Sequence, residues 1–80
     1  MSNQQVTIDI PEKVLLAEKT DAATFAQEIR MLAAVKLFEI GRLSSGRAAE
    51  LAGMSRVEFL LNLKRYQVFP FSAELEDLEK

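Results

Sequence analysis

Apolar and polar residues alternate with a period of two near the start of the chain. Val6, Ile8 and Ile10 alternate with polar residues and the alternation stops before Pro11. A period of two with β-branched residues predicts a strand over 5–10. A lone strand leaves its backbone donors and acceptors unpaired, and no second strand is evident downstream. We therefore expect this strand to pair with its counterpart in a second copy, across a two-fold axis.

The apolar spacing then changes to three and four, which is typical of helices. Residues 12–19 predict one or two helical turns, and Thr20 or Asp21 is the expected cap of a long helix over 21–41. Gly41 is expected to follow its last turn, where positive φ is needed. The apolar row of this helix is Phe25, Ile29, Leu32, Val35 or Lys36, and Ile40.

Residues 44–66 predict two short helices joined by a tight turn. Gly53 stands where the turn requires positive φ. Ser55 precedes the second helix and Glu58 follows three residues later, which is the spacing of a capping box. Two helices joined in this way form the unit that places a recognition helix in the major groove of DNA.

One position in the second of these helices departs from the usual pattern. In a twenty-residue helix-turn-helix frame that starts at Ser45, the eighteenth residue is usually apolar, but here it is Asn62. Leu60, Leu61 and Leu63 surround it and are interpreted as core residues. We therefore expect the second helix to be rotated or shifted relative to the standard pairing.

The composition narrows the classes of function. The 80 residues predict a single domain, 1–80, and contain neither Cys nor His. Their absence removes disulfides, thiolate metal sites and the commonest general base. We expect no catalytic residues, no cofactor and no metal site, and therefore no enzyme. The apolar runs are too short for a membrane span and the start lacks a signal peptide, so a cytoplasmic location is expected.

The net charge of −2 conceals two regions of opposite charge. Residues 42–66 carry five cationic and two anionic side chains, a net charge of +3, whereas residues 72–80 carry one cation and four anions, a net charge of −3. A basic region beside an acidic tail indicates two surfaces for two partners. The alternative is that each charge only solvates its own surface, since the sequence pI of about 5.1 is far from that of a typical nucleic-acid-binding domain.

Several residues of the basic region are candidates for DNA contacts. Ser55, Arg56 and Glu58 begin the second helix, where base edges are read. An Arg donates two hydrogen bonds to guanine, while a Glu accepts one from cytosine or merely caps the helix. The residues expected to contact phosphates are Arg42, Ser44, Ser45, Arg47, Lys64 and Arg65. The alternative for each cation is an exposed side chain without a partner.

The last twelve residues, 69–80, form an acidic tail with two aromatic residues on either side of Pro70. Aromatic side chains on an extended segment need a cover, which the same domain, the dimer mate or a groove of another protein would provide. The residues predicted to bind a partner are Phe69, Phe71, Glu74, Leu75 and Leu78.

The stretch Gly-Arg-Leu-Ser-Ser-Gly-Arg-Ala-Ala-Glu-Leu-Ala-Gly-Met-Ser-Arg-Val-Glu-Phe (41–59), followed by Leu-Lys-Arg-Tyr (63–66), resembles the small prokaryotic proteins of uncharacterised protein family 0175. Ile-Pro-Glu (10–12) and Ala-Ala-Val-Lys-Leu-Phe-Glu-Ile-Gly (33–41) fit the same family. That family is similar to antitoxins of toxin–antitoxin pairs. The resemblance implies a dimer that binds its own operator and wraps a terminal segment over a toxin of the PIN-domain nuclease type.

The sequence therefore predicts a mainly α fold with a short N-terminal β-strand and a helix-turn-helix. The expected function is that of a dimeric DNA-binding transcriptional regulator of the antitoxin type. The alternative is a protein–protein interaction module without DNA binding, in which the two helices are only a packing unit.

Overall fold

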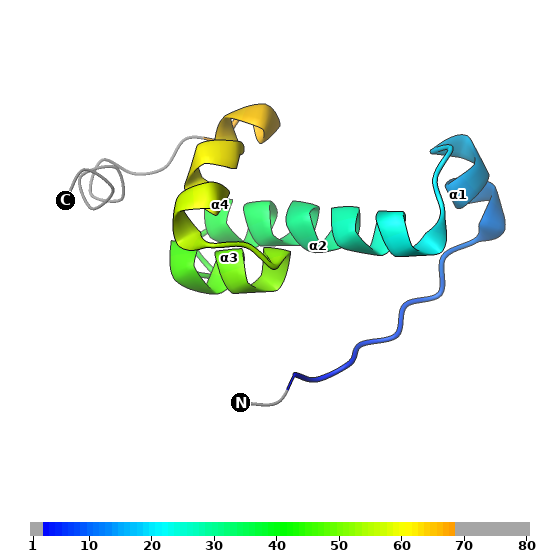
Figure 1. Cartoon of the computed structure of the whole chain (residues 1–80), viewed down its shortest axis with the longest axis horizontal. Helices are drawn as coiled ribbons and strands as arrows, with labels where there is room; N and C mark the ends of the chain where they lie inside the picture. Colours follow the sequence, from blue (N-terminus) through cyan, green and yellow to red (C-terminus); the bar gives the residue numbers. More distant parts are fainter. Residues whose placement is uncertain (1–2, 69–80) are drawn as a thin grey trace.

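The computed structural model describes residues 3–68, which are helical apart from an extended N-terminal segment and short connections (Figure 1). Their elements are α1 (Glu12–Ala17), α2 (Ala22–Glu39), α3 (Ser45–Ala52), α4 (Arg56–Asn62) and the 3-10 helix η1 (Leu63–Tyr66). α3 and α4 pack at the C-terminal end of α2, whereas α1 lies at its other end (Figure 1).

No β-strand occurs in residues 3–68, so the prediction of a strand over 5–10 is wrong. Residues 3–10, called the arm below, are extended but belong to no sheet, and Val6 is 82% exposed. Alternating apolar residues indicate an extended backbone, but a strand also needs a second extended segment to pair with. No other described segment supplies one, so pairing of Val6, Ile8 and Ile10 as a dimer strand is withdrawn.

The predicted end signals of the long helix are confirmed. Asp21 caps the start of α2, because its carboxylate accepts a hydrogen bond of 2.8 Å from the backbone N–H of Thr24. That hydrogen bond holds the pKa of Asp21 below its usual value. At the other end, Gly41 has a φ of +78°, which satisfies the left-handed conformation expected after the last turn.

The core lies between the C-terminal half of α2 and the helices α3, α4 and η1. The Phe38 and Phe59 rings meet edge to face there, with centroids 5.7 Å apart and planes at 88°. The buried apolar residues are Met31, Ala34, Val35, Phe38, Ala48, Ala49, Ala52, Phe59, Leu60, Leu63 and Val68.

Of the apolar row predicted for α2, only Val35 is buried in this core. Phe25 and Ile29 are only half-buried, and Ile40 is 55% exposed. Met31 and Phe38 are buried instead, on the other side of the helix. The spacing of apolar residues did not identify the core side, because α2 carries apolar residues on two opposite sides.

The departure at Asn62 coincides with a change in helix type. α4 ends at Asn62, whose amide donates a 2.8 Å hydrogen bond to the carbonyl of Glu58, and η1 follows. Leu63, the first residue of η1, is fully buried. Leu61 is 69% exposed, so its interpretation as a core residue is wrong.

Candidate nucleic-acid interface

α3 and α4 are joined by a turn whose geometry the sequence anticipated. Gly53 has a φ of +75°, and its N–H bonds back to carbonyls of the last turn of α3. Ser55 then caps α4: its hydroxyl accepts from the backbone N–H of Glu58 at 3.2 Å, while its own N–H donates to the Glu58 carboxylate at 3.4 Å. The predicted capping box is therefore confirmed.

Two side chains of α2 hold the C-terminal end of α3 in place. Gln27 donates a hydrogen bond of 2.8 Å to the carbonyl of Ala52, and Arg30 donates one of 2.8 Å to the carbonyl of Leu51. These bonds satisfy carbonyls that a helix end leaves without an intrahelical partner. No local sequence pattern signals these contacts, because they join residues more than twenty positions apart.

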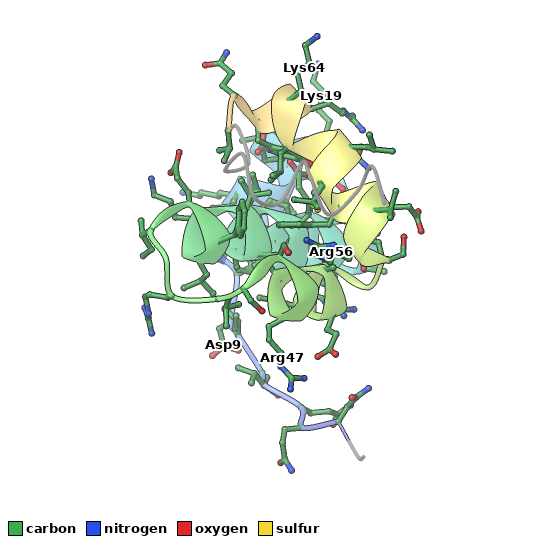
Figure 2. The ribbon with its side chains drawn as sticks, turned by 90° about the vertical axis from the view of Figure 1, so that its left-hand side faces the viewer. Asp9, Lys19, Arg47, Arg56 and Lys64 are labelled. Atoms are coloured by element: carbon green, nitrogen blue, oxygen red, sulfur yellow. The ribbon has the colours of Figure 1, made fainter. Side chains whose placement is uncertain are left out.

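Arg56 connects the two helices of the unit. Its Nε donates a hydrogen bond of 2.8 Å to the hydroxyl of Ser45, which is only 3% exposed. Arg56 precedes the buried Leu60 by four residues and therefore lies on the core side of α4. Figure 2 shows it between α3 and α4. Both residues were predicted to contact DNA, and both are engaged within the domain.

The remaining cations lie on the surface. Arg47 pairs with Glu50 at 3.0 Å on α3, and both side chains are well exposed. Such a surface pair contributes little stability, so it leaves Arg47 available to a phosphate. Arg42, Lys64 and Arg65 are also exposed. Arg47 and Lys64 lie at opposite ends of the two-helix unit in Figure 2.

Ser44 and Glu58 serve the starts of the two helices. The hydroxyl of Ser44 accepts from the backbone N–H of Arg47 at 3.2 Å and caps α3. Glu58 closes the capping box of α4, and its carboxylate also accepts from the hydroxyl of Ser55 at 3.1 Å. A contact from Glu58 to cytosine would therefore compete with these local bonds.

The outward side of α4 carries two apolar residues that sequence reasoning missed. Val57 is 50% exposed and Leu61 is 69% exposed. They stand four residues apart and so lie on the same side of the helix. Exposed apolar side chains on a helix suit either the methyl group of thymine in a major groove or the surface of a protein partner. The exposure of these two residues marks them as candidates for a contact. The sequence alone does not show this exposure, because it does not show which side of α4 faces the core.

The predicted partner-binding residues Phe69, Phe71, Glu74, Leu75 and Leu78 lie outside the described residues. Within residues 3–68, no helix is long and apolar enough to cross a membrane. The same part of the chain contains no group of three or more acidic side chains placed to hold a metal ion.

Comparison with known proteins connects the chain to one family. The family described as Uncharacterised protein family (UPF0175) matches residues 1–80. A UPF0175 protein of Archaeoglobus fulgidus is 43% identical over 54 residues, which are 68% of this chain and 61% of that protein. A UPF0175 protein of Aeropyrum pernix is 48% identical over 50 residues, which are 60% of this chain and 63% of that protein. The chain thus matches less than two thirds of the length of either relative, and no solved structure matches it.

Proposed function

We propose that this chain, which belongs to the uncharacterised protein family UPF0175, is a dimeric DNA-binding transcriptional regulator that contacts a duplex through α3 and α4. The observation that carries the proposal is the α3–turn–α4 unit, which has the exposed Arg47 on α3 and three further exposed cations just before and just after it in the chain. The unit is fixed by the capping box and by the bond between Arg56 and Ser45. The exposed cations are Arg42, Arg47, Lys64 and Arg65.

The two kinds of contact fall to different residues. The exposed cations neutralise phosphates and set the position of the protein on the duplex. The outward side of α4 faces the bases, with Ser55 at its start and Val57 and Leu61 along it. Arg56 holds α3 against α4 and so keeps that side presented.

The number of exposed cations sets the expected dependence on salt. Each phosphate neutralised on B-DNA contributes about −0.9 to the slope of log K against log salt concentration. Four contacts per protomer give a slope of about −3.6. Affinity should then fall roughly 100-fold per protomer between about 50 and 200 mM salt.

Fluorescence anisotropy with a labelled duplex from upstream of the reading frame tests the proposal, with a scrambled duplex as control. The informative variant is Arg47→Gln combined with Lys64→Gln. Its matched control is Lys13→Gln combined with Lys36→Gln, which removes the same charge from α1 and α2. The first variant should lower the slope by about one per lost phosphate contact, and the control should not. Equal effects of the two double variants would contradict the assigned surface.

The antitoxin role is a further part of the proposal, supported by the family resemblance. In that role a segment outside the described residues, 69–80, covers a toxin of the PIN-domain nuclease type. The test is co-purification with such a nuclease encoded beside this chain. Capture should be lost when residues 69–80 are deleted, while DNA binding by α3 and α4 remains.

The exposure of Val57 and Leu61 also favours a second candidate, a protein–protein interaction module without DNA binding. Substitution of deoxyuridine for thymine in the duplex removes only the methyl groups. It therefore distinguishes a DNA-binding regulator from an interaction module. If the two residues read thymine, this substitution weakens specific binding by the wild-type protein. A folded protein that binds no upstream duplex at about 50 mM salt would favour the interaction module.

A further inference from the structure

α2 has an apolar side that the core does not use. Ala22, Ala26, Ile29 and Ala33 are separated by four, three and four residues, the spacing of a seam between two packed helices. They line one side of the helix, whereas the core residues occupy the opposite side. A helix that is apolar on two opposite sides requires contacts on both.

This unused side forms one wall of an open groove of about 740 Å³. The arm and α1 form the other wall, through residues that include Val6, Ile8 and Leu15. The arm does not close the groove, because Val6 remains 82% and Ile8 59% exposed. Phe25 is only half-buried along the same wall. Both walls are apolar, so the groove favours an apolar occupant.

We propose that the occupant is α2 of a second copy of this chain, packed antiparallel on the first. On α2 the lining of the groove runs from Ala22 to Ala33, and the exposed Lys36 stands at the next position of the same spacing. The stretch of α2 that lines the groove, residues 22–33, is about 17 Å long, so an occupant of about three helical turns fills it. The spacing of four, three and four residues is the one at which two packed helices meet, and it favours a helix as that occupant.

The seam is complementary to itself. A two-fold axis between positions 27 and 28 sets Ala26 against the partner's Ile29, and Ala22 against the partner's Ala33. A small residue thus faces a large one at the centre, as close helix packing requires. Such an interface is isologous, because each copy supplies the same surface. The inferred interface rests on the proposed function, because that function calls for a two-fold dimer. It takes the place of the strand pairing that was withdrawn above.

Sedimentation equilibrium of the full chain tests the interface in the absence of DNA. The wild-type protein should sediment as a dimer, at twice the 9.0 kDa of one chain. Ile29→Glu places a carboxylate in the seam and should weaken the dimer at least ~30-fold. Leu16→Glu places the same carboxylate at an exposed position on α1 that does not line the groove, and it should leave the mass unchanged. A monomeric wild-type protein, or a dimer that Ile29→Glu does not weaken, overturns the proposal.

Cross-linking tests the register without a disruptive substitution. The chain has no cysteine, so Ala26→Cys introduces a single reactive thiol next to the proposed axis. A short bis-maleimide should join two such chains, but not two chains that carry Leu16→Cys at an exposed position outside the groove. Absence of an Ala26→Cys cross-link overturns the antiparallel seam. It would point to another occupant, either residues 69–80 of the same chain or a different protein.

The outcomes for the interface and for DNA binding remain distinct. A dimer held by the seam that ignores every duplex would contradict the proposed function and leave the interface standing. A wild-type protein that binds the duplex specifically while its dimer is insensitive to Ile29→Glu would contradict only the interface.

Discussion

Replacement of Gly53 by alanine tests whether the left-handed turn sets the stability of the α3–α4 unit. A Cβ built at position 53 would lie 3.6 Å from Nη2 of Arg30, an ordinary van der Waals contact with a flexible side chain. The substitution therefore creates no clash. Its cost arises from the backbone, because φ is +75° and an L-residue is disfavoured there.

The magnitude follows from that conformation. An L-residue in the left-handed region costs about 1–2 kcal/mol relative to glycine, so Gly53→Ala should lower the free energy of unfolding by about that amount. Gly46 provides the matched control, because it lies within α3 and a Cβ there meets no atom within 4 Å. Gly46→Ala should raise the free energy of unfolding by about 0.5–1 kcal/mol.

Urea denaturation followed by circular dichroism at 222 nm measures both variants. The protein concentration must be held constant, because the proposed dimer would contribute to apparent stability. The two variants should differ by about 2 kcal/mol, or by about 8–16 °C in Tm for a domain of this size. If Gly53→Ala is as stable as the wild type, or if Gly46→Ala is the less stable variant, the reasoning from backbone conformation is refuted.

Substitutions at three further positions test the core and the helix caps. Phe59→Ala removes the fully buried ring that meets Phe38 and should lower the free energy of unfolding by about 3–5 kcal/mol. The thermal transition of this variant should therefore be lost or strongly lowered. A Tm close to that of the wild type would contradict the assignment of Phe59 to the core. Ser55→Ala removes the cap of α4 and should cost about 1 kcal/mol in urea denaturation, whereas Ser55→Asp should restore most of it. Because the pKa of Asp21 is lowered in the folded state, its contribution to stability is present above its unfolded pKa of about 3.9 and is lost as the pH falls through the folded pKa. Asp21→Asn keeps a capping oxygen but does not titrate. The Tm of the wild type relative to this variant should therefore fall only below about pH 4. If the Tm of both proteins falls in parallel, Asp21 is not the cause of the loss of stability in acid.

The features that the sequence predicted correctly depend on neighbouring residues. The cap at Asp21, the left-handed Gly53 and the capping box between Ser55 and Glu58 each lie within one helical turn. Local hydrogen bonds and the φ angle of one residue determine them, so the residue types suffice to place them.

The features that the sequence-based prediction missed depend on contacts between distant parts of the chain. The arm has the alternating pattern of a strand, but a strand also needs a second segment to pair with. The alternation within the arm does not show whether such a segment exists. α2 has two apolar sides, so its spacing could not show which one meets α3. Arg56 was expected to face DNA, but its partner Ser45 lies eleven positions earlier. Only the packing of α3 against α4 brings the two residues together.

The contact of α2 with α3 has a consequence for the mutations that this chain tolerates. Ala34 on α2 belongs to the same core as Ala48, Ala49 and Ala52 on α3, and all four are at most 2% exposed. Each of these four side chains is a single methyl group, so a larger residue at any of the four positions adds volume to a filled interior and typically costs about 1–3 kcal/mol. In a saturation library selected for folding, the positions of α3 that reject substitution should therefore recur at the helical spacing of three and four residues. Its buried positions would retain almost only Ala, Gly or Ser, while its exposed positions Arg47 and Glu50 would accept most residues that do not break a helix.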